Sequence, residues 1–232
     1  MSDASEKVLG IKQLPIFPLP VVLMPSELLP LHIFEEKYRQ MLKDVELQKN
    51  LFGLSYFDPQ ETFAERPAPG TVGCVAEIND VQMLPDGRSN ILTMGIIRYR
   101  ITEYVQTDAP YLVAEVEFFE DEKEEGARLN ELSDEVFSLF KRVAKAAHKI
   151  SGQRGEFPDI PQAEPEQLSF LISSAFNLEN DLKYRMLETR STTERLENMR
   201  DILKNAVKQI EDSAEIHKIS QTNGHSKKKI NL

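Results

Sequence analysis

The 232-residue sequence has little cysteine and no long apolar run, and each shortage excludes a class of protein. Cys74 is its single cysteine, which excludes an internal disulfide and a structural zinc site built on several thiolates, so packing must stabilise the fold. No segment supplies the roughly 18 consecutive apolar residues that would span a bilayer, and residues 1–10 lack the basic and then apolar pattern of an export signal. We therefore expect a cytoplasmic protein without a membrane segment.

Basic residues are also scarce, since 28 Lys and Arg oppose 38 Asp and Glu. Up to Ala127 there are 22 acidic and 11 basic residues, whereas the rest of the chain has 16 acidic and 17 basic ones, so the acidic excess lies in the first half. Binding to phosphate backbones or anionic lipid depends on Lys and Arg that displace counterions. Nucleic acid is therefore a disfavoured partner, above all for the first half.

Motifs for catalysis and metal binding are missing as well. No Gly-Lys pair occurs, which excludes a P-loop, and no Gly-x-Ser-x-Gly sequence marks a nucleophile elbow. The histidines, at 32, 148, 217 and 225, are far in sequence from one another and from Cys74, so they indicate no metal site. Cys74 occupies an apolar-facing strand position, where we expect a buried thiol. We predict no catalytic residue, no cofactor and no metal ligand.

The first 126 residues are expected to form a β-rich subdomain. Apolar residues recur at steps of three and four between Phe34 and Gln48, which predicts one amphipathic helix. Pro85-Asp86-Gly87 predicts a hairpin, because Pro presets φ and Gly supplies a positive φ. Extended chain or strands are expected at 14–23, 51–57, 71–78, 81–84, 90–97, 99–105 and 111–119. Short turns between these strands favour an antiparallel barrel or sandwich.

A run of carboxylates closes this subdomain. Between Glu115 and Glu125 seven acidic residues surround the single base Lys123, and Gly126 follows. Self-repelling segments usually lie in solvent, so we expect a solvated linker at the domain boundary, with a surface for a basic partner as the alternative.

Residues 127–219 are expected to form a helical subdomain. Helical periodicity runs from Leu129 to Ile150, resumes after Pro165, covers a short stretch near Met186, and returns after Ser191. Amphipathic helices with short connections bury their apolar stripes against each other, which predicts a helical bundle. Residues 220–232 are polar, and we expect them to be a disordered tail.

Several segments together resemble the N-terminal substrate-binding domain of Lon protease. The resemblance covers about residues 12 to 212 and is carried by blocks that follow one another in the order of that family. These blocks are Ile16-Phe17-Pro18-Leu19, Val22-Leu23-Met24-Pro25, Leu29-Pro30-Leu31-His32-Ile33-Phe34-Glu35 with Tyr38-Arg39, Val72-Gly73-Cys74-Val75-Ala76-Glu77-Ile78, Leu84-Pro85-Asp86-Gly87-Arg88 and Gly95-Ile96-Ile97-Arg98-Tyr99-Arg100.

The resemblance implies an α+β fold, a PUA-like antiparallel β pseudobarrel followed by an α-helical bundle. The sequence stops where the ATPase module of Lon would begin, so we expect a stand-alone, non-catalytic domain. Its expected ligands are unfolded or tagged proteins, or a protease-associated partner. The most family-like block holds the candidate binding residues at a loop that leads into a helix: Pro30, Leu31, His32, Ile33 and Phe34.

Other interpretations of the sequence stay open. Ile33 and Phe34 are also typical of core residues that pack where a chain enters a helix. An RNA-binding role is an alternative function because PUA-like barrels can bind RNA, although the acidic first half disfavours it. A third hypothesis is a hydrolase whose site matches no known motif.

Overall fold

The computed structural model describes residues 2–57, 65–150, 157–176 and 178–223, with side chains described up to residue 210. Its contacts divide the chain into two compact units. The first unit is Met1–Lys123 with Glu166–Thr192, and the second is Glu124–Pro165 with Thr193–Leu232. The single boundary expected after residue 126 therefore differs from this division, in which a later segment of the chain returns to the first unit.

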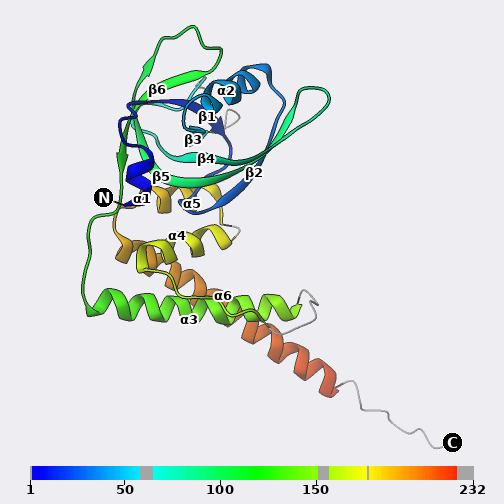
Figure 1. The fold of residues 1–232 in the computed structure, drawn as a ribbon. Coiled ribbons are helices and arrows are strands. Elements are labelled where there is room, and N and C mark those ends of the chain that lie inside the picture. Colours follow the sequence, from blue (N-terminus) through cyan, green and yellow to red (C-terminus); the bar gives the residue numbers. More distant parts are fainter. Residues whose placement is uncertain (1, 58–64, 151–156, 177, 224–232) are drawn as a thin grey trace, which may run out of the picture. The chain divides into compact units, whose positions relative to one another are not determined.

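The first unit is built on a six-stranded sheet (Figure 1). The strand order is β2-β5-β4-β3-β1-β6, and β6 also pairs with β5, so five strands close into a ring and β2 lies outside it as an edge strand. The strands are β1 (Gln13–Leu19), β2 (Leu28–Ile33), β3 (Leu51–Tyr56), β4 (Val72–Met83), β5 (Ser89–Val105) and β6 (Leu112–Phe119). This closed sheet is the β pseudobarrel expected from the sequence.

The pseudobarrel is mixed rather than wholly antiparallel, because β1 and β3 pair in parallel. The chain between them makes β2 and then helix α2 (Glu36–Glu46), a crossover that brings β3 back in the direction of β1. The buried residues of α2 are Tyr38, Met41, Leu42 and Val45, which confirms the expected amphipathic helix.

Strands β4 and β5 are longer than the sequence indicates. Each of them joins two segments that we expected to be separate, and register shifts in their ladder accompany the joins. The predicted hairpin at Pro85-Asp86-Gly87 is confirmed: Gly87 has φ of 79° and donates its N–H to the carbonyl of Leu84 at 3.0 Å. Because β5 is long, it pairs with β2 through Ser89–Met94 and with β6 through Arg98–Val105. We call the strands that project beyond the ring, β2 with the hairpin ends of β4 and β5, the wing.

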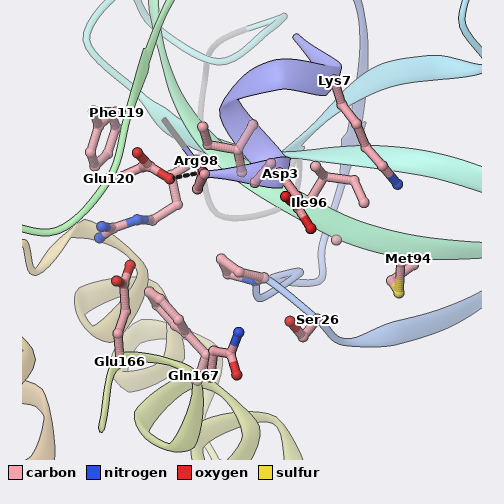
Figure 2. A pocket seen from close by; sticks show the side chains of 16 residues that line it. Asp3, Lys7, Ser26, Met94, Ile96, Arg98, Phe119, Glu120, Glu166 and Gln167 are labelled. Carbon is pink, nitrogen blue, oxygen red and sulfur yellow. Dashed lines mark hydrogen bonds between the residues drawn. The ribbon is translucent and has the colours of Figure 1, made fainter. Parts of the chain in front are cut away.

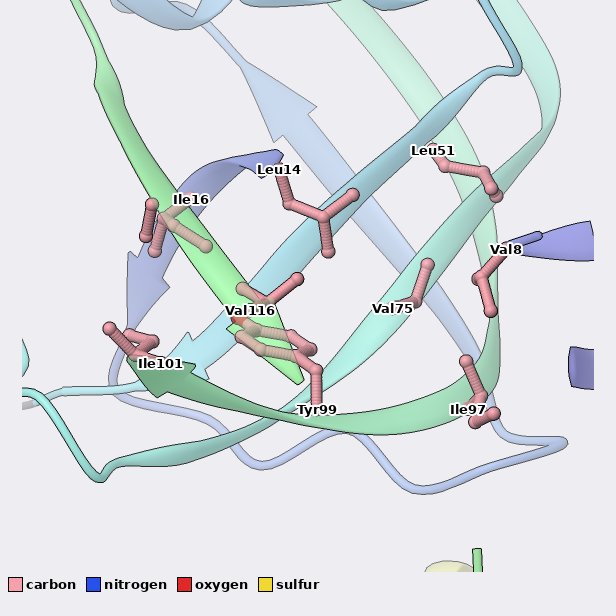
Figure 3. Packing of buried hydrophobic residues seen from close by; sticks show 10 residues of the cluster. Val8, Leu14, Ile16, Leu51, Val75, Ile97, Tyr99, Ile101 and Val116 are labelled. Atoms are coloured by element: carbon pink, nitrogen blue, oxygen red, sulfur yellow. The ribbon is translucent and has the colours of Figure 1, made fainter. Parts of the chain in front are cut away.

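Apolar side chains fill the ring (Figure 3). The buried cluster comprises Val8, Leu14, Ile16, Leu51, Val75, Ile97, Tyr99, Ile101, Ala114 and Val116. Tyr99 is fully buried, and its hydroxyl shares a hydrogen bond of 2.7 Å with Ser55 Oγ. A Cβ at Gly73 would lie only 2.5 Å from that hydroxyl, so the ring leaves no space for a side chain at this position.

Two of the helices that we expected in the bundle belong to the first unit. These are α4 (Pro165–Ala175) and α5 (Asn180–Glu188). The hydroxyl of Tyr184 accepts a hydrogen bond from Val72 N at 3.1 Å, and Lys183 pairs with Glu27 at 2.7 Å. Helix α1 (Asp3–Lys7), which the sequence did not indicate, also lies in this unit. These contacts attach α5 to β4 and to the segment that leads into β2.

The second unit contains the two long helices. Helix α3 (Ala127–Ile150) buries Leu132, Val136, Phe137 and Leu139, and helix α6 (Thr192–Asn223) buries Leu196, Met199, Leu203 and Val207. Because α6 continues to Asn223, residues 220–223 are helical and not part of a disordered tail, while residues 224–232 lie outside the described part. Among the described residues, every helix is too short or too polar to span a bilayer.

The acidic run is not a solvated linker throughout. Its first residues belong to β6, whereas Glu122 and Glu125 are exposed as expected. The side chain of Asp121 is 3% exposed and forms an ion pair with Arg98, which is itself 1% exposed. A buried guanidinium requires a counter-charge, and this requirement overrides the tendency of a charge run to stay in water.

Candidate functional site

The five candidate residues lie on β2 and just beyond it, not in a loop. Side chains alternate between the faces of a strand, and exposure follows that rule: Pro30 and His32 are exposed, whereas Ile33 is 1% exposed and Leu31 is half-buried. Phe34 is 60% exposed, with its ring stacked on His32 at a centroid distance of 6.1 Å. Ile33 is therefore a core residue, and Pro30, His32 and Phe34 share the exposed face.

The neighbouring strand extends this exposed face. Leu28, 56% exposed, pairs with Met94, and Pro30 pairs with Leu92. Residues paired across two strands share a face of the sheet. We call this surface the wing face, made of Leu28, Pro30, His32, Phe34, Leu92 and Met94. The sequence did not single out Leu28, Leu92 or Met94, because only the register of β2 against β5 places them beside the candidate block.

Hydrogen-bonded polar side chains cross the three strands of the wing beside His32. Asn90 lies opposite His32 on β2 and opposite Gln82 on β4. Its Oδ1 is 2.7 Å from His32 Nδ1, and its Nδ2 donates to Gln82 Oε1 at 3.2 Å. These bonds join the three strands and hold the His32 ring against Phe34, so an apolar surface is presented in a fixed orientation.

A pocket of about 460 Å³ in the first unit begins at Met94, where the wing face ends. Figure 2 shows its lining side chains, which come from α1, β5, the first turns of α4, the loop before β2 and the end of β6. Arg98 lies at its wall but is occupied by Asp121 and by the carbonyl oxygens of Leu187 and Thr189, at 3.1 and 2.6 Å. Its guanidinium is therefore engaged in bonds within the protein and stabilises the fold.

The groups that the sequence offered for chemistry lie as follows among the described residues. Cys74 is fully buried as expected, and burial raises the pKa of its thiol to about 12, so the thiolate needed for nucleophilic attack does not form near neutral pH. Within the described ranges, no group of three His, Cys, Asp or Glu side chains is arranged to hold a metal ion. The exposed imidazole of His32 faces an amide, which holds the ring in place.

The edge of β2 is a second feature of the surface. Edge strands present unpaired backbone groups on which another chain can pair. Pro30 interrupts this edge because it has no N–H to donate. Short stretches of backbone are thus offered beside exposed apolar side chains, and Pro30 limits long uninterrupted pairing.

Known proteins resemble this chain in sequence. The family of the ATP-dependent protease La (LON) substrate-binding domain matches residues 13–205. Among curated relatives, Lon protease of Brevibacillus choshinensis is 29% identical over 201 residues, covering 84% of this chain and 25% of the relative. Lon protease of Desulforamulus reducens is 28% identical over 193 residues, covering 82% and 23%. The chain thus spans about a quarter of the length of these relatives.

Solved structures share the fold. A Lon N-terminal domain protein from Xanthomonas campestris superposes with a TM-score of 0.60 at 20% identity, covering 82% of this chain and 97% of that one. The N-terminal domain of Mycobacterium avium complex Lon protease gives a TM-score of 0.61 at 19% identity, with 83% and 98% covered. The sequence match over most of the chain and the shared α+β architecture lead to one conclusion: the chain belongs to the LON substrate-binding domain family.

Proposed function

We propose that this protein binds unfolded or tagged protein segments through the wing face and needs no catalytic step to do so. The observation that carries the proposal is the exposure of Leu28 on the edge strand β2 and of Phe34 directly after it, at 56% and 60%. Large apolar side chains that gather on an exposed surface typically mark an interaction site. The single cysteine fits binding in a reducing compartment such as the cytoplasm.

An extended segment of an unfolded protein fits this surface for two reasons. Its backbone can pair with the free edge of β2, and its apolar side chains can cover Leu28, Leu92 and Met94. Neither contact demands a particular sequence, because backbone groups are common to all chains and apolar contact is not directional. The protein should therefore recognise the unfolded state rather than one folded partner.

The proposal is tested with a permanently unfolded reporter, such as a reduced and alkylated secretory protein, labelled for fluorescence anisotropy. The double variant Leu28→Glu/Phe34→Glu should weaken binding at least tenfold, since it places charge where apolar surface is buried. Leu47→Glu/Ile150→Glu is the matched control, because those side chains are 87% and 80% exposed and lie outside the wing face.

Three results would count against the proposal. The first is that the wild-type protein leaves the reporter unbound, and the second is that the wing and control variants bind it equally. Salt-sensitive binding to RNA, with no binding to the unfolded reporter, would favour the RNA-binding alternative instead.

A further inference from the structure

A groove of about 660 Å³ lies between helix α2 and the β4–β5 hairpin. Helix α2 contributes Arg39, Leu42, Lys43 and Glu46 to it, and β4 contributes Val81 and Met83. Val81 and Met83 pair with Ile91 and Ser89 of β5, residues that alternate with those of the wing face. The groove is therefore a separate surface on the same unit.

The two walls of the groove meet at both ends. At the hairpin turn, a Cβ placed on Gly87 would lie 2.3 Å from Nη2 of Arg39, so the guanidinium reaches the turn. At the other end, Ile78 N donates to the carbonyl of Asn50 at 3.0 Å. Helix α2 rises by about 1.5 Å per residue, so Arg39 and Glu46 are about 10 Å apart along the groove.

The charges of the groove are ordered along its length. Arg39 reaches the hairpin turn and Lys43 lies about one helical turn further along α2, whereas Glu46 and Asp80 lie toward the end at Asn50. Within the part of the chain that the structure describes, none of these four side chains forms an ion pair or a side-chain hydrogen bond. The groove thus has a cationic end and an anionic end, both available to a ligand.

The middle of the groove is apolar. Leu42 is 8% exposed and forms the floor, while Val81 and Met83 are 47% and 64% exposed. Ser89 Oγ lies 3.1 Å from Met83 Sδ and directs that side chain. Exposed Val and Met gain from being covered by another apolar group.

We propose that the groove binds an extended peptide segment in which an apolar stretch separates an acidic residue from a basic one. The acidic residue would face Arg39 and Lys43, and the basic residue would face Glu46 and Asp80. An extended chain rises by about 3.3 Å per residue, so about three residues span the distance between the charged ends. This inference rests on the proposed function and adds a preference in substrate sequence.

The test uses capped, labelled peptides with the same central leucines and different flanking charges. One set carries an acid and a base in both orders, a second carries two acids, and a third carries two bases. In fluorescence anisotropy at low salt, the wild-type protein should bind a mixed-charge peptide roughly tenfold more tightly than either like-charged one, as two weak ion pairs at the ends would give.

Variants of the groove should change this preference. In Arg39→Glu/Lys43→Glu both ends are acidic, so the peptide with two bases should bind best, and Lys43→Glu alone should shift the preference in the same direction. The control is Lys12→Glu/Lys149→Glu, which makes the same change in net charge at exposed positions outside the groove. It should rank the affinities for the three peptide sets as the wild-type protein does. Circular dichroism would confirm that each variant folds.

Equal binding of the three peptide sets by the wild-type protein would overturn the groove assignment, and so would a groove variant that keeps the wild-type order. Binding of the unfolded reporter separates the two proposals. If the wild-type protein binds the reporter but binds the three peptide sets equally, only the groove assignment is refuted. A reporter that does not bind refutes the proposed function itself.

Discussion

Replacing Arg98 with methionine should cost the first unit about 3–5 kcal/mol of its free energy of unfolding. The side chains of Arg98 and Asp121 are 1% and 3% exposed, so the variant leaves a buried carboxylate without its counter-charge. Domains usually have a total stability of about 5–15 kcal/mol, so a loss of this size removes a large share of it.

Several other contacts of Arg98 add to this loss. The variant also removes donors from the carbonyl oxygens of Leu187 and Thr189, and it removes a guanidinium 4.7 Å from the centre of the Phe119 ring. Leaving the buried Leu187 carbonyl without this donor costs about 1–3 kcal/mol. The double variant Arg98→Met/Asp121→Leu should therefore not regain wild-type stability, but it should lose far less than the sum of the two single variants.

Urea unfolding followed by tyrosine fluorescence measures these losses. All six tyrosines belong to the first unit, and the chain has no tryptophan, so the signal reports on that unit. Arg88→Met is the control, because Arg88 pairs with Asp86 at the surface and should leave the urea midpoint nearly unchanged. A loss below about 1 kcal/mol for Arg98→Met, or strictly additive losses in the double variant, would refute the reasoning.

Three further outcomes follow from the packing of the ring. Gly73→Ala should cost about 1–3 kcal/mol in urea titration, because its Cβ would lie 2.5 Å from the Leu54 carbonyl oxygen, and unchanged stability would contradict this. Tyr99→Phe should cost about 1–3 kcal/mol by leaving the buried Ser55 hydroxyl unpaired, whereas Tyr111→Phe, at a half-buried site, should cost less. Burial raises the pKa of Cys74 from 9.0 to about 12, because the core favours the neutral thiol over the thiolate. The stability that the buried neutral thiol provides is therefore complete below about pH 9 and is lost as the pH rises through 12. Stability that increases over that range would disprove it, as would rapid labelling of the native thiol.

Local patterns in the sequence predicted local structure well. The three- and four-residue spacing of apolar residues indicated α2, and Pro85-Asp86-Gly87 indicated the hairpin, because both signals depend on neighbours within a few residues. The same signals did not show that β1 and β3 are parallel. They also did not indicate α1, whose five residues are too few to display a helical period.

The exposure of the candidate residues could be predicted only in part. The block from Pro30 to Phe34 resembled the family, but the sequence did not tell which of its residues would be exposed. Alternation along β2 placed Pro30 and His32 on one face and Ile33 on the other. That β2 is a strand depends on its pairing with β5, and such pairing is set by tertiary contacts more than by local preference.

The burial of particular charged residues could not be predicted from the sequence. The acidic run from Glu115 to Glu125 was expected in solvent, and Arg98 lies in an apolar stretch where its burial could not be recognised. Both side chains of the Arg98–Asp121 pair are buried because each satisfies the other. Pairing of residues 23 positions apart in sequence leaves no periodic signal, so only the folded chain could show it.

The sequence by itself determined the amphipathic helix α2, the long helices α3 and α6, the hairpin turn and the family of this protein, because helical period, turn residues and motif order are properties of the linear chain. Tertiary structure decided that five strands close into a ring, that β2 remains an edge, and that α4 and α5 join the first unit. It also decided which apolar residues form the wing face and which charges line the groove. The physical reason is that strand register and burial depend on contacts between distant segments, whose free energy exists only when the chain has folded.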